Sequence, residues 1–74
     1  MKDARAEQRR DRRVVTMTVL TPKDEQGRAR FVLDWWCSSQ ARWRGQVFYA
    51  ALDVWIPRLR REYPGRVLRV VDRA

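Results

Sequence analysis

The chain has no histidine, one cysteine and no long apolar run, and each absence excludes a class of protein. Cys37 is the single cysteine, so no disulfide forms within the chain, and without histidine we expect no zinc site. No segment approaches the roughly 20 apolar residues of a membrane-spanning helix, and the first residues are charged rather than apolar. We therefore expect a cytoplasmic protein that holds no metal and no cofactor.

The groups that usually carry catalysis are also missing. General acid–base chemistry near neutral pH commonly uses histidine or two carboxylates that act together. Asp34 and Asp53 fall on different predicted elements and face outward, so each is expected to balance a nearby arginine. Ser38 and Ser39 have no neighbouring base that would activate them. We do not expect an enzyme.

Arginine and tryptophan are abundant instead. Seventeen lysines and arginines face nine acidic residues, and four tryptophans occur within 74 residues. Arginine grips phosphate or carboxylate through a planar fork and stacks on rings, while tryptophan supplies a large apolar contact area. The composition indicates a binding protein, although a genome rich in G and C would also produce an excess of arginine.

Charge and apolar residues divide the chain into two parts. Residues 1–13 contain almost no apolar side chain and predict a flexible basic arm, whereas residues 14–74 have the size of one small domain. The arm is interpreted either as a tether that follows a phosphate backbone or as a solvated tail.

Two stretches alternate as β-strands do. Residues 14–20 are rich in β-branched side chains, and residues 28–36 separate an inner from an outer face. Residues 21–27 between them concentrate turn formers, with Gly27 free to adopt positive φ. The predicted inner face of the second strand consists of Phe31, Leu33 and Trp35.

A helical period follows the second strand. Ser38 and Ser39 are suitable N-caps, Pro64 and Gly65 would end the helix, and Pro57 on its solvent side would bend it without breaking it. Gly45 would lie on the buried side and let helix and sheet approach closely. The predicted core face of this long helix consists of Ala41, Gly45, Phe48, Leu52, Trp55, Ile56, Leu59 and Tyr63.

Residues 67–71 supply a third predicted strand. The expected fold is α+β with the order ββαβ, in which a three-stranded antiparallel or mixed sheet of order 2-1-3 is covered on one face by one long helix. The other face of such a sheet has no cover, and it would display Val32, Trp36, Val67 and Val71 together with Arg30 and Arg69. A second exposed row on the helix would consist of Trp43, Val47, Ala50 and Val54, flanked by Arg42, Arg58 and Arg61.

These surfaces favour binding to a nucleic acid or a nucleoprotein complex in a regulatory or accessory role. Unpaired bases would stack on Trp36 or Trp43, which predicts single strands or RNA, although a groove of duplex DNA stays open as a second target. The candidate contact residues are Arg9, Arg10, Arg12, Arg13, Arg30, Trp36, Arg42, Trp43, Arg58, Arg61 and Arg69.

Two further interpretations stay open. One is a phage- or plasmid-type inhibitor or adaptor, comparable to anti-CRISPR proteins, that blocks a host protein complex through an arginine and tryptophan patch. The other is a homodimer, which is compatible with either function. The candidate dimer or partner surface consists of Val32, Trp43, Val47, Val54, Val67 and Val71.

Overall fold

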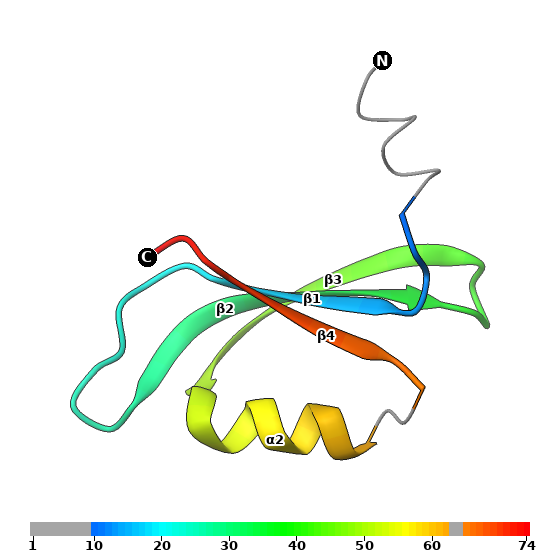
Figure 1. The fold of residues 1–74 in the computed structure, drawn as a ribbon. Coiled ribbons are helices and arrows are strands. Elements are labelled where there is room, and N and C mark those ends of the chain that lie inside the picture. Colours follow the sequence, from blue (N-terminus) through cyan, green and yellow to red (C-terminus); the bar gives the residue numbers. More distant parts are fainter. Residues whose placement is uncertain (1–9, 63–64) are drawn as a thin grey trace.

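The computed structural model describes residues 10–62 and 65–74, which form a four-stranded mixed sheet and one short helix (Figure 1). The sheet order is β3-β2-β1-β4, in which β1 pairs antiparallel with β2 and parallel with β4, and β2 pairs antiparallel with β3. The predicted α+β class is confirmed. The elements are β1 (Val14–Val19), β2 (Arg28–Cys37), β3 (Arg42–Ala51), α2 (Leu52–Glu62) and β4 (Val67–Asp72).

The prediction of one long helix after Ser38 was wrong, because residues 42–51 form β3 and the fold is βββαβ. Ser38 and Ser39 are not helix caps. They lie in the turn between β2 and β3, where Ala41 adopts a positive φ of 51°. The residues of β3 explain the difference, since aromatic and β-branched side chains favour a pleated strand and glycine disfavours a helix interior.

Helix α2 begins directly after β3, at Leu52, and ends at Glu62. Its buried residues are Leu52 and Leu59, while Pro57 lies inside the helix and is exposed, on the solvent side as predicted. The acidic first turn and basic last turn both complement the helix dipole. The predicted roles of Tyr63 and Pro64 lie outside the described residues.

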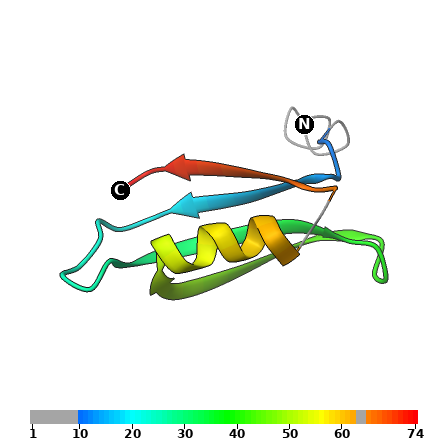
Figure 2. The same cartoon turned by 60° about the horizontal axis from the view of Figure 1, so that its bottom comes forward.

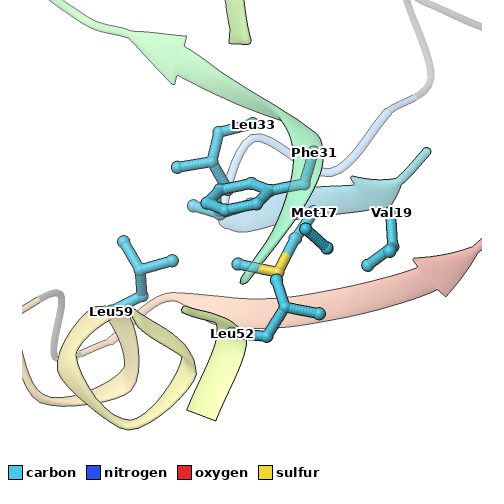
Figure 3. Close-up of a cluster of buried hydrophobic side chains, with 8 residues drawn as sticks. Met17, Val19, Phe31, Leu33, Leu52 and Leu59 are labelled. Atoms are coloured by element: carbon cyan, nitrogen blue, oxygen red, sulfur yellow. The ribbon is translucent and has the colours of Figure 1, made fainter. Parts of the chain in front are cut away.

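The core lies between α2 and the face of the sheet that the helix crosses (Figure 2). Met17 and Phe31 are its largest fully buried side chains, and Leu52 and Leu59 of α2 approach them from the helix side (Figure 3). The ring of Phe31 stacks on Phe48, with centroids 5.6 Å apart. The predicted inner face of β2 is largely confirmed, because Phe31 and Leu33 are buried while Trp35 is half-buried.

The loop between β1 and β2 is organised by Asp24. Its Oδ1 accepts hydrogen bonds from the backbone N–H groups of Gln26 and Arg28, both at 2.9 Å, and its other oxygen accepts the hydroxyl of Tyr49. Gly27 has a φ of 76°, which confirms the predicted positive value. The loop is thereby tied to β3 as well as to β2.

Candidate binding surface on the open face of the sheet

The face of the sheet opposite α2 carries the alternate residues of all four strands. No helix or strand among the described residues packs over it, and the segment that leads into β1 lies on this side (Figure 1). The strand registers place on it all six residues predicted for an uncovered face, and they add Trp43, Val47 and Tyr49 from β3. We call this surface the open face.

An aromatic pair lies on the open face. Trp36 of β2 is directly opposite Trp43 of β3, and the two rings meet edge to face with centroids 5.8 Å apart and an interplanar angle of 74°. Both side chains are half-buried, although neither contacts the core cluster. Cross-strand aromatic pairs stabilise a sheet, yet here the pair also leaves ring surface accessible.

Two arginines stack on this pair. The guanidinium carbon of Arg10 lies 3.9 Å from the ring centroid of Trp43, and that of Arg12 lies 3.9 Å from the ring centroid of Trp36. These are cation–π contacts, and they show that planar cationic groups reach the exposed ring faces. Arg9, which was predicted to join them, lies outside the described residues.

The turn at Asp11 positions the two stacked arginines. Asp11 Oδ1 accepts the backbone N–H of Arg13 at 2.9 Å, and its Oδ2 accepts from the Arg13 guanidinium at the same distance. These hydrogen bonds hold the pKa of the Asp11 carboxyl below its ordinary value. Arg13 thus forms an exposed ion pair with Asp11, and its role as a contact residue stays a prediction.

The open face is basic. Arg30 and Arg69 are exposed, and neither forms an ion pair within the described residues. Asp34 is the acidic residue that the strand registers place among them, half-buried beside Gly45. Gly45 is exposed on this face, opposite α2, so the prediction that it packs between helix and sheet was wrong. Its neighbour there is Asp34, because a Cβ added at Gly45 would lie 2.9 Å from Asp34 Oδ1.

The predicted exposed row on a long helix does not exist as one surface. Trp43, Val47 and Ala50 lie on β3, and Val54 alone of that row lies on α2, where its side chain is exposed. The structure thus moves Trp43 and Val47 to the open face, beside Trp36.

The remaining candidate arginines lie away from the open face. Arg58 forms an ion pair with Glu62, one helical turn away, at 3.1 Å, and Arg61 is exposed on the same helix. Arg42 is paired in register with Cys37 at the end of the hairpin, and its Nε donates to Gln40 Oε1 at 3.0 Å. Arg42 is next to Trp43 along β3, but strand alternation directs it to the helix side of the sheet, where Arg58 and Arg61 of α2 also lie.

A pocket of about 590 Å³ opens on the helix side, where α2 leaves the end of the β2–β3 hairpin uncovered. Trp35, Phe48 and Trp55 form part of its wall, and the half-buried thiol of Cys37 also lines it. A hydrogen bond with Ser39 Oγ, at 3.2 Å, is the main cause that lowers the pKa of this thiol. Sequence reasoning missed the pocket because its wall includes Gln46 and Phe48 of β3, a strand that the sequence did not predict.

No family model, curated protein or solved structure matches this chain. Within residues 10–62 and 65–74, no helix is long and apolar enough to cross a membrane. The same part of the chain contains no group of three or more His, Cys, Asp or Glu side chains that would hold a metal ion. The function is therefore argued from the chemistry of the open face.

Proposed function

We propose that this is a small non-enzymatic protein whose open face binds single-stranded nucleic acid, free or within a nucleoprotein complex. The observation that carries the proposal is the Trp36–Trp43 pair on an uncovered sheet, contacted by Arg10 and Arg12. Proteins that bind single strands combine aromatic side chains, on which bases stack, with a basic surface that follows the phosphates. A regulatory or accessory role fits a chain of this size.

The stacked arginines do not prevent a base from binding. An exposed cation–π contact contributes about 0.5–1 kcal/mol, whereas stacking of one base on an aromatic side chain contributes about 1–3 kcal/mol. A base therefore displaces the guanidinium group of Arg10 or Arg12 from its ring. The displaced guanidinium remains next to the bound nucleotide, where it pairs with a phosphate.

The same geometry favours single strands over duplexes. Bases within a duplex are already stacked on one another, so they present no free face to Trp36 or Trp43. An α-helix can enter a major groove, but helix α2 lies on the other side of the sheet from Trp36 and Trp43, so it cannot act together with them on one duplex. A duplex would meet only the arginines, and its binding would be weaker.

Fluorescence anisotropy of the full chain with labelled oligonucleotides tests this function. We expect a single-stranded RNA or DNA of about 15 nucleotides to bind more tightly than a duplex of equal length, and its affinity to fall at least about tenfold between 50 and 200 mM salt. Equal affinity for duplex and single strand would contradict the stacking role. No binding at 50 mM salt would reject the function.

Exposed apolar side chains favour a second candidate, a protein that blocks a host complex through the same face. Val47 and Tyr49 are 57% and 56% exposed on β3. Adjacent exposed apolar side chains of this size often mark a contact site for another protein. An apolar contact site of this kind depends little on ionic strength, whereas phosphate contacts weaken steeply with salt. Binding to a purified partner that persists at 500 mM salt and is lost in Trp43→Ala would support this candidate.

A further inference from the structure

We propose that two copies of this chain pair through β3, antiparallel and around a two-fold axis, so that their sheets join into one of eight strands. β3 is an edge strand of ten residues without proline, and no described element pairs with its outer side. Long unpaired edges are normally shortened, covered or paired in proteins. This inference is independent of nucleic acid binding.

The backbone of β3 presents its free groups in a regular array. Leu52 N donates to Gly27 O at 3.3 Å, in continuation of the β2–β3 register, and antiparallel ladders bond the same partner at every second residue. The even-numbered residues of β3 therefore bond to β2. The N–H and C=O groups that point outward belong to Trp43, Gly45, Val47, Tyr49 and Ala51.

These same five residues lie on the open face, where all but Gly45 carry a side chain, and they complement one another in an antiparallel pair. When the two-fold axis passes through Val47, this residue lies opposite the partner's Val47, a β-branched pair that favours a sheet. Tyr49 then lies opposite the partner's Gly45, which has no side chain to clash with it, and the Tyr49 hydroxyl keeps its hydrogen bond to Asp24. The exposed side chain of Val47 is thus covered by its counterpart.

Charge does not oppose this register. With the axis at Val47, Arg44 and the partner's Arg44 are six positions apart along the paired strands, or about 20 Å at about 3.4 Å per residue. With the axis at Gln46 the separation falls to about 14 Å. The screening length at physiological salt is about 8 Å, so either separation leaves little repulsion between the two Arg44 side chains.

The pairing adds buried surface to a domain that has little. Only eight hydrophobic residues are buried in the described part of the chain, and domains of this size commonly rely on a second subunit. A two-fold axis perpendicular to the sheet keeps both open faces on the same side. The two Trp36–Trp43 pairs would then lie on one continuous surface.

Sedimentation velocity of the full chain at about 10–200 µM in 300 mM NaCl tests the pairing. We expect twice the monomer mass of 8.9 kDa for the wild type. Val47→Lys places two like charges against each other at the axis and should give the monomer mass. The matched control is Val67→Lys, a change at a 60% exposed residue on the same face of the other edge strand, which should remain dimeric. Far-UV circular dichroism verifies that both variants are folded.

A mixture of two variants tests the register itself. Val47→Lys and Val47→Glu should each be monomeric alone and should form a dimer when mixed, because residue 47 pairs only with itself. A monomeric mixture would overturn this register. Two results would overturn the pairing through β3. One is a wild type that stays monomeric up to 200 µM, and the other is a dimer that Val67→Lys disrupts and Val47→Lys does not. The free edge of β3 would then be available to pair with a strand of another protein.

Discussion

The indole rings of Trp36 and Trp43 meet edge to face across β2 and β3, 5.8 Å apart, while Trp35 projects to the opposite face of the same strand. Trp35 and Trp55 pack against the core cluster, and the other two tryptophans do not. The four tryptophans are thus divided equally between a structural and an accessible face. Substitution of Trp35 or Trp55 should therefore change mainly the stability of the fold, and substitution of Trp36 or Trp43 mainly the affinity for a ligand.

Removal of one open-face ring should weaken binding without unfolding the protein. We expect Trp43→Ala to lower the affinity for single-stranded RNA by about 5- to 150-fold, which corresponds to about 1–3 kcal/mol for one stacked base. Anisotropy titration measures the affinity, and the thermal midpoint checks the fold. Trp35→Phe, on the helix side, serves as the control and should retain the affinity. Equal losses in both variants would argue against a site on the open face.

Charge on the open face should determine how binding depends on salt. We expect Arg30→Gln and Arg69→Gln each to reduce the slope of log affinity against log salt by about 0.7, the contribution of one phosphate contact to a single strand. Arg60→Gln and Arg61→Gln remove the same charge from α2 and should leave the slope unchanged. The slope is obtained from titrations at four salt concentrations. A reduction that is the same in all four variants would indicate nonspecific attraction by net charge.

The reactivity of the single cysteine should depend on one hydroxyl group. The hydrogen bond with Ser39 is the largest cause that lowers the pKa of Cys37, followed by the backbone N–H of Gln40. We expect Ser39→Ala to shift the pH profile of iodoacetamide alkylation to higher pH, because less thiolate is present at a given pH. Ser38→Ala is the matched control and should leave the profile unchanged. Identical profiles for wild type and Ser39→Ala would contradict the assigned contact.

The Asp24–Tyr49 hydrogen bond should make stability depend on pH at both extremes. It lowers the pKa of Asp24, whose contribution is complete above its ordinary value of about 4 and is lost as pH falls through the folded value. It raises the pKa of Tyr49, whose contribution is complete below about 10 and is lost as pH rises through the folded value. We expect the urea midpoint of Tyr49→Phe to be lower than that of the wild type at pH 7 and to fall less above pH 10. Parallel pH curves for the two proteins would exclude this contact.

Replacement by alanine should destabilise the protein more at Gly27 than at Gly45. Gly27 has a φ of 76° with no atom near its missing Cβ, so Gly27→Ala should cost about 1–2 kcal/mol through backbone conformation alone. Gly45→Ala should cost less, because the crowding atom is the end of the Asp34 side chain, which can rotate away. Urea denaturation of both variants measures the difference. A larger loss in Gly45→Ala would show that Asp34 is held rigidly.

The sequence predicts β1, β2 and β4, whose ends are marked by turn-forming residues. It does not predict β3, whose residues it places in a helix. Phe48, Leu52, Trp55 and Leu59 recur at helical spacing, although Phe48 lies on a strand and the other three on α2. The coincidence arises because β3 passes into α2 without an intervening turn, so residues on the core side of both elements form one apparent stripe. Neither proline nor glycine marks the junction at Ala51 and Leu52.

The candidate site was therefore predicted in parts rather than as a whole. Alternation in β2 placed Trp36 and Arg30 on an uncovered face, as the structure has them. The position of Trp43 beside Trp36 requires β3, and the contacts of Arg10 and Arg12 require that pair in turn. No local pattern in residues 1–13 indicates which arginine meets which ring, since that depends on contacts distant in sequence.

The most direct test of the central claim is the response of the four indole N–H signals to a single-stranded RNA in ¹H–¹⁵N correlation spectra of the full chain. The account predicts that the signals of Trp36 and Trp43 shift progressively with added RNA, while those of Trp35 and Trp55 on the other face keep their positions. Four unchanged signals, or shifts confined to Trp35 and Trp55, would contradict binding at the open face.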